Sequence, residues 1–156
     1  MIEIEVPGFG QLKIKHLVCD YSGTLSVDGV LVPGVRERLD RLADKVDIHI
    51  VTADTHGKVK EQVAGTRYRL ILLTGADQDI QKEDYIKKLG AEQVAAIGNG
   101  SNDRRMLALA GVGIAVCLKE GVAVEALKGA RILTNSINDA LDLLLFTDRL
   151  KATLRF

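Results

Sequence analysis

The chain has 156 residues, which suits one domain and leaves little room for a second. Apolar residues make up 47% and charged residues 27%, an ordinary balance for a globular protein, and 21 basic side chains match 21 acidic ones. This match excludes a strong net field that would draw the chain to nucleic acid or to an anionic membrane. No apolar run reaches about 18 residues and the start does not resemble a signal peptide, so we expect a cytoplasmic protein without membrane contact.

The aromatic residues and the cysteines indicate which partners and which cross-links to expect. The three tyrosines do not form a platform for stacking bases and tryptophan is absent, so we expect no nucleic-acid partner. The two cysteines, Cys19 and Cys117, each lie within an apolar run. We therefore expect buried, reduced thiols and no disulfide framework.

Apolar periodicity predicts the elements in chain order. Residues 2–14 alternate on either side of the sequence Pro-Gly-Phe-Gly, which predicts an N-terminal β-hairpin. Beyond it, short apolar runs predict strands at residues 17–19, 47–51, 69–73, 94–97, 113–117 and 131–133. Helical spacing and glycine or proline boundaries predict helices at residues 35–42, 57–65, 82–89, 104–110, 122–127 and 137–146.

This alternation of strands and helices predicts an α/β fold. We expect a three-layer, doubly wound, mostly parallel sheet with helices on both faces, in a single domain of residues 1–156. In such sheets ligands bind at the carboxyl ends of the strands. Polar residues follow three predicted strands, namely Asp20, Thr52 and the segment 98–100. The functional site is therefore expected at that edge.

The first polar segment is Asp20-Tyr21-Ser22-Gly23-Thr24. A carboxylate at a strand end, followed by Gly-Thr, places a nucleophile beside backbone amides that can hold phosphate oxygens. The ordinary interpretation, an aspartate where a strand turns, stays open for this segment alone.

The second polar segment spans residues 98–103 and contains Asn99, Asn102 and Asp103. Its glycines suggest a dinucleotide fingerprint, but Asp103 stands where the third glycine belongs and would repel a pyrophosphate. A carboxylate there suits a hard cation such as Mg²⁺. The alternative is a glycine turn with Asn102 or Asp103 as a helix cap.

Two further residues complete the candidate set. The Thr52 hydroxyl, beside Ala53, can donate to a phosphoryl oxygen, although threonine is also a good helix N-cap. Lys82, expected where its helix opens, can neutralise two carboxylates and a phosphate. Lys87 and Lys88 compete for that role.

Together these segments, in this order, resemble the motif set of the haloacid dehalogenase superfamily over about residues 17–146. Residues 20–24 are similar to the phosphorylated D-K-T-G-T of P-type ATPases, residues 52–54 to their T-G-D, and residues 98–103 to their G-D-G-x-N-D. The chain looks closest to the capless soluble relatives of that phosphorylation domain.

The resemblance implies a Mg²⁺-dependent phosphohydrolase or phosphotransferase that forms an aspartyl-phosphate at Asp20. It implies that Thr52 and Lys82 hold the phosphoryl group. The substrate would also be bound by Gly23, Ala53 and Asn102, and the ion by Asp20, the backbone carbonyl of Ser22, Asn99 and Asp103.

Two residues depart from the family pattern. Ser22 stands where phosphatases of the family carry a second aspartate as general acid and base, so we expect a preference for good leaving groups and a long-lived phosphoenzyme. Asn99 stands where an aspartate is usual, so we expect weaker Mg²⁺ binding. A non-catalytic phosphate- or ligand-binding protein, with a regulatory role on the same fold, remains the alternative.

The spacing between the motifs leaves no room for a cap domain. Only 27 residues separate Thr24 from Thr52, and 29 separate Thr52 from Lys82. We expect an open site that takes a phosphorylated small molecule or macromolecule, and a homo-oligomer that completes it. Residues 26–32 predict a small flap that turns at Asp28-Gly29.

Four further expectations concern single residues and the C-terminus. His16 and His49 fall in strand patterns and are expected to be structural, whereas His56 is expected to be a solvated residue near a helix start. The apolar tail at residues 150–156 is expected to pack on the chain's own core or on a partner.

Overall fold

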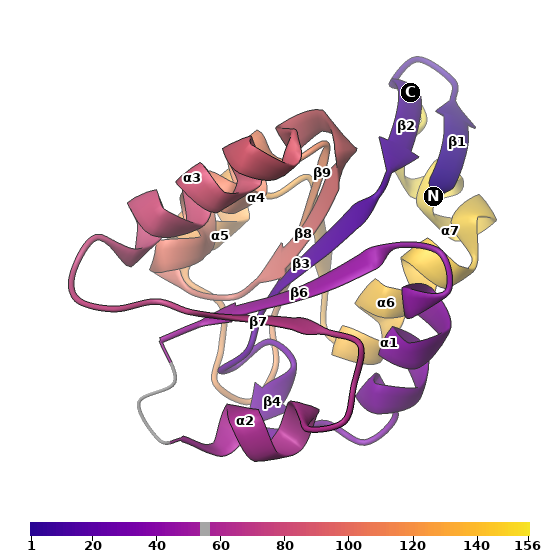
Figure 1. Cartoon of the computed structure of the whole chain (residues 1–156). Helices are drawn as coiled ribbons and strands as arrows, with labels where there is room; N and C mark the ends of the chain where they lie inside the picture. Colours follow the sequence, from indigo (N-terminus) through magenta and orange to yellow (C-terminus); the bar gives the residue numbers. More distant parts are fainter. Residues whose placement is uncertain (54–56) are drawn as a thin grey trace.

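A six-stranded parallel sheet forms the centre of the molecule (Figure 1). The computed structural model describes residues 1–53 and 57–156 of the chain. The strands lie side by side in the order β10-β9-β8-β3-β6-β7. Their bounds are β3 His16–Asp20, β6 Asp47–Thr52, β7 Arg69–Leu72, β8 Val94–Gly98, β9 Val112–Val116 and β10 Ile132–Thr134. The expected mostly parallel sheet is confirmed.

Helices cover both faces of this sheet and give three layers, as expected. One face packs against α1 (Val35–Ala43) and α6 (Ile137–Leu145), and α7 (Thr147–Leu154) packs against α6. The other packs against α3 (Gln78–Leu89), α4 (Arg104–Leu109) and α5 (Val124–Gly129). The short helix α2 (Lys58–Val63) buries Val59 and Val63 in the first of these two cores.

The alternation of side chains along β3 explains why both faces are apolar. Leu17 and Cys19 point into the core under α1 and α6, whereas Val18 points into the core under α3 and α4. By the same period of two, His16 and Asp20 lie on the Val18 face, at opposite ends of the strand. This face therefore carries a polar residue at each edge of the sheet.

The N-terminal hairpin is confirmed, with β1 (Ile2–Val6) antiparallel to β2 (Gly10–Ile14). Its alternate residues are buried in the core that α7 also enters with Leu150 and Leu154. The tail thus packs on the chain's own core, while Phe156 beyond it is 93% exposed. That the whole chain folds as one domain stays a prediction.

Between the motifs, the described residues contain the expected flap, β4 (Ser26–Val27) and β5 (Val30–Leu31), and single core elements. The described parts of these segments therefore hold no cap domain. Two 3₁₀ turns, Ala91–Gln93 and Ser101–Asp103, flank β8. In the described ranges, no helix is both long enough and apolar enough to cross a membrane.

Three expectations need correction. Helix α3 begins at Gln78, so Lys82 lies inside the helix and does not open it. A further helix, α7, follows the one that was expected to close the chain. Cys19 is buried as expected, but Cys117 is exposed because it follows the last residue of β9, where the chain leaves the sheet. Both thiols are free.

Candidate active site

One buried ammonium group joins two carboxylates at the carboxyl edge of the sheet. The Lys82 Nζ donates to Asp20 Oδ1 at 2.9 Å and to Asp103 Oδ1 at 2.6 Å. The three residues are 1%, 7% and 0% exposed, respectively. Burial excludes water from these contacts, so the charges interact more strongly than they would at the surface.

The fold explains why three distant residues meet. Asp20 is the last residue of β3, and Asp103 closes the 3₁₀ turn that follows β8, the neighbour of β3 in the sheet. Neighbouring parallel strands end at the same edge. Helix α3 crosses above them and directs Lys82 inward, whereas Lys87 on the same helix pairs with Glu83 at the surface. Of the lysines considered, Lys82 is the one whose ammonium group contacts both carboxylates.

Asp103 stabilises the turn and faces the site at once. Its Oδ2 accepts the backbone N–H groups of Asn99 at 3.0 Å and Gly100 at 2.9 Å, while its Oδ1 accepts from Lys82. A Cβ at position 98 would lie 2.5 Å from the Asp103 Cγ, so only glycine allows this approach. The Asp103 side chain thus closes the 3₁₀ turn and makes no cap hydrogen bond to α4, while its other oxygen contacts Lys82.

Thr24 links the end of β3 to the segment that follows β8. Its Oγ1 lies 3.2 Å from Asp20 Oδ2 and 3.1 Å from Asn99 Oδ1. The Asn99 Nδ2 donates to the Gly121 carbonyl at 3.1 Å, which orients the Oδ1 toward Asp20. Gly23 has a φ of 75°, and a Cβ there would lie 2.5 Å from the Asn99 Nδ2. Sequence reasoning named Thr24 within its motif but assigned it no role.

A pocket of about 210 Å³ opens above this network. Its lining residues are Asp20, Ser22, Thr52, Ala53, Gln78, Lys82, Asn99, Gly100 and Asn102. The structure thus brings the predicted site residues together, with Gly23 and Asp103 in contact with Asn99. Gln78 was missed; it accepts from the Asn102 Nδ2 at 3.2 Å, and no sequence pattern singles it out. Thr52 does not cap α2, whose N-cap is Gly57.

Residues 54–56, which include the expected Asp54 and His56, lie outside the described residues. Two larger pockets of about 380 Å³ lie elsewhere, around Met1 and Lys15, and contain none of the predicted site residues.

Burial and neighbouring charges shift the pKa values of Asp20 and Lys82. Burial raises the pKa of Asp20, the Asp103 carboxylate raises it further, and Lys82 opposes both effects. Burial alone would lower the pKa of Lys82, but the two carboxylates outweigh burial and raise this pKa above its usual value. Lys82 therefore stays charged, and with both carboxylates ionised the three groups carry a net charge of about −1.

This donor set fits a hard divalent cation. Asp20 Oδ2 and Asn99 Oδ1 contact the same hydroxyl group, so the two oxygens lie close together and face the same space. A carboxylate offers about four lone-pair positions, and the named contacts of Asp103 use three of them. Carboxylate and amide oxygens in a negatively charged pocket are the ligands that Mg²⁺ prefers.

The profile of the haloacid dehalogenase-like hydrolases matches residues 42–139. The chain belongs to this family. Membership confirms the expected resemblance, and with it the expectation of a hydrolase. The matched range includes Thr52, Lys82, Asn99 and Asp103, whereas the Asp20 segment precedes it.

Relatives agree with this assignment. An uncharacterised protein of Methanocaldococcus jannaschii is 44% identical over 78 residues, which cover 50% of this chain and 78% of that protein. A phosphoserine phosphatase of Streptococcus thermophilus is 34% identical over 101 residues, 63% of this chain and 46% of the enzyme. The chain therefore spans less than half the length of that phosphatase.

A solved structure shows the same fold over nearly the full length. It is the 3-deoxy-D-manno-octulosonate 8-phosphate phosphatase of Moraxella catarrhalis, in complex with a magnesium ion, a phosphate ion and its sugar acid. The TM-score is 0.65 at 22% identity, over 91% of this chain and 94% of that one.

Replacing Lys82 tests the buried charge cluster. We expect Lys82→Met to lower the free energy of unfolding by about 3–5 kcal/mol near pH 7, because two buried carboxylates lose their counter-charge. Lys82 opposes the rise in the Asp20 pKa, so the variant should raise this pKa further. A carboxyl group whose pKa is raised by folding contributes stability that is present at low pH and is lost as the pH rises through the folded pKa. The variant therefore loses more stability than the unaltered chain as the pH rises, and the difference between the two should shrink as the pH falls.

Urea denaturation at about pH 5 and about pH 8 measures this effect. Lys87→Met, which removes a surface lysine of the same helix, is the control and should change stability by about 0.5 kcal/mol or less at either pH. Equal losses for the two variants would contradict the buried cluster.

Proposed function

We propose that this chain is a Mg²⁺-dependent phosphohydrolase that works through an aspartyl-phosphate at Asp20. The observation that carries the proposal is the Lys82 ammonium group shared by Asp20 and Asp103, next to an open pocket at the carboxyl edge of the sheet. The names of the relatives support it, since a phosphoserine phosphatase and a magnesium-bound sugar-acid phosphatase both act on phosphorylated small molecules. We propose the same class of substrate here.

Asp20 performs the first chemical step. One of its carboxylate oxygens attacks phosphorus, and the bond between phosphorus and the leaving-group oxygen breaks, with its electron pair going to that oxygen. Lys82 holds the charge of the site during the attack, and the Thr52 hydroxyl donates to a phosphoryl oxygen. A water molecule then attacks the phosphorus of the aspartyl-phosphate, which releases inorganic phosphate and restores the carboxylate.

Four groups would hold the cation beside this nucleophile. They are the carboxylates of Asp20 and Asp103, the Asn99 side-chain oxygen and the backbone carbonyl of Ser22. When bound, Mg²⁺ offsets the negative charge of the phosphoryl oxygens that Asp20 must approach. Thr24 orients Asp20 and Asn99 for this task through its shared hydroxyl.

Ser22 sets the preference among substrates. It is exposed on the pocket wall, where phosphatases of the family carry an aspartate, and its hydroxyl cannot deliver a proton to a leaving alkoxide near neutral pH. Acyl phosphates, anhydrides and aryl phosphates need no such proton. We propose that these are favoured over alkyl monoesters, and that an open pocket is completed by a second copy of the chain.

Phosphorylation of Asp20 is the direct test. The protein is mixed with acetyl phosphate and Mg²⁺, quenched in acid and digested, and the peptides are analysed by mass spectrometry. We expect a phosphoryl group on the peptide that contains Asp20, and no label in Asp20→Asn or without Mg²⁺. Asp28→Asn, which changes an exposed aspartate of the flap, should be labelled as fully as the unaltered chain. An unlabelled but folded protein that still binds phosphate would instead favour the non-catalytic binding role.

An acidic side chain at position 22 should change the rate of phosphate-ester hydrolysis. We expect Ser22→Asp to speed hydrolysis of an alkyl monoester such as phosphoserine by roughly 10²–10⁴-fold, because the carboxyl group can protonate the leaving oxygen and then activate water. The phosphoenzyme lifetime should shorten in the same variant. Ser22→Asn has a similar shape but no exchangeable acid, and it should leave both quantities near their starting values. Equal hydrolysis rates for the two variants would show that residue 22 does not act as a general acid or base.

Asn99→Asp tests the cation site. The variant adds a negative charge beside Asp20, so we expect the half-saturating Mg²⁺ concentration to fall by roughly tenfold or more. It also removes the donation to the Gly121 carbonyl, so the thermal midpoint without Mg²⁺ should fall. Titration calorimetry and thermal unfolding measure the two effects separately. An unchanged Mg²⁺ requirement would show that residue 99 is not a ligand.

A further inference from the structure

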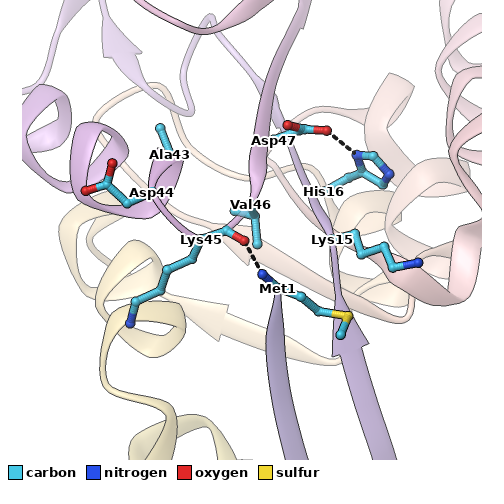
Figure 2. A pocket seen from close by; sticks show the side chains of 8 residues that line it. All are labelled: Met1, Lys15, His16, Ala43, Asp44, Lys45, Val46 and Asp47. Carbon is cyan, nitrogen blue, oxygen red and sulfur yellow. Dashed lines mark hydrogen bonds and ion pairs between the residues drawn. The ribbon is translucent and has the colours of Figure 1, made fainter.

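A second polar cluster lies at the opposite edge of the sheet, on the same face as Asp20. It consists of His16, Asp47 and His49, whose ligand atoms all lie within 4.8 Å of one another. His16 and Asp47 form part of the wall of a pocket of about 380 Å³, and Figure 2 shows the ring and the carboxylate turned toward each other. The cluster takes no part in the phosphoryl chemistry proposed above.

Strand register brings the three residues together. His16 is the first residue of β3 and lies opposite Asp47, the first residue of β6. His49 follows two residues later in β6 and therefore points to the same face as Asp47. The His16 Nδ1 lies 3.2 Å from the His49 Nε2 and 3.6 Å from the Asp47 Oδ2. Two imidazole nitrogens and one carboxylate oxygen thus lie within 4.8 Å of one another.

These separations agree with the geometry of a bound transition metal. Zinc binds imidazole nitrogens at about 2.0–2.1 Å, and two ligands in a tetrahedron then lie about 3.3 Å apart. The pair of histidine nitrogens already has this spacing. Asp47 has a side chain that is 57% exposed and can rotate by the small amount needed to complete the set.

A fourth residue orients the buried ligand. The His49 Nδ1 lies 2.7 Å from the Tyr85 hydroxyl of α3, and His49 itself is fully buried. When Nδ1 carries the proton and donates to this hydroxyl, the Nε2 lone pair faces His16 and Asp47. A metal-binding histidine usually has such a partner on its other nitrogen.

We propose that His16, Asp47 and His49 bind a transition metal ion, with Zn²⁺ as the ion that this donor set suits. Two imidazoles and one carboxylate favour Zn²⁺ and its neighbours in the first transition row over Mg²⁺ or Ca²⁺. Water from the adjoining pocket takes the fourth position. The ion ties the starts of β3 and β6 to each other and, through Tyr85, to the helix that carries Lys82.

The surrounding charges bear on the choice of ion. Besides Asp47, the charged groups that act on the two rings are Arg69 and Lys15, both cationic. A site with two positive neighbours and one carboxylate is unfavourable for an ion held by charge alone. It tolerates an ion held mainly by neutral imidazoles, which is a further reason to expect Zn²⁺.

The competing explanation is a simple hydrogen-bonded chain. In it, Tyr85 donates to the His49 Nδ1, and the His49 Nε2–H donates to the His16 Nδ1. Both arrangements satisfy the same heavy-atom distances, because the position of the protons is not fixed by them. They differ in whether a metal binds.

Titration calorimetry with Zn²⁺ decides between them. The protein carries Cys117→Ser, because the exposed thiol would bind zinc by itself, and excess Mg²⁺ is present to occupy the phosphoryl-transfer site. We expect one Zn²⁺ per chain. His16→Gln and Asp47→Asn should each weaken binding by about tenfold or more, and Tyr85→Phe by about 10–100-fold through the lost orientation of His49.

Asp44→Asn is the matched control, since Asp44 is an exposed carboxylate that lines the same pocket but lies outside the cluster. It should leave the Zn²⁺ affinity unchanged. Replacing Zn²⁺ by Co²⁺ should give the visible absorption of a four-coordinate ion, and this absorption should disappear in His16→Gln. Absence of stoichiometric binding, or equal affinities in all variants, overturns the proposal without touching the one for Asp20.

Discussion

The buried contact of Lys82 with Asp20 and Asp103 is the interaction on which the carboxyl edge of the sheet depends. Two carboxylates this close would repel each other strongly in a site from which water is excluded, and burial alone would favour their neutral forms. The ammonium group offsets this repulsion, although burying three charged groups has a large desolvation cost. These three buried groups lie beside an open pocket, and two carboxylates with one ammonium group favour a cation over an anion there.

Asn99 and Ser22, the two residues that depart from the family pattern, differ in how many contacts they make with the rest of the chain. Asn99 donates to the Gly121 carbonyl and accepts from Thr24, so it satisfies groups on both of its sides. A carboxylate there would face the carbonyl oxygen without a proton to share. Ser22 is exposed on the pocket wall and its replacement would disturb little. The asparagine is thus part of a hydrogen-bonded network, whereas the serine lines the pocket.

Helix α3 connects the two polar edges of one sheet face. Lys82 points to the carboxylates at the end of β3, and Tyr85, three residues later, reaches His49 near the start of β6. Ile86, the residue after Tyr85, is fully buried in the same apolar core as Val18 and Val51. The helix is consequently held by apolar packing and by polar contacts toward both edges, which restricts how it can shift over the sheet.

Much of this was predictable from the sequence because it depends on short-range patterns. Apolar periodicity determined the kinds of elements and their order, and the rule that parallel strands end at one edge placed Asp20, Thr52 and Asp103 together. The tertiary structure alone decided which lysine enters the site, because that depends on where α3 begins and how it lies over β3. It also decided the contact of Thr24 with Asn99, 75 residues away, and the exposure of Cys117. Such features arise from the packing of layers, which local patterns do not encode.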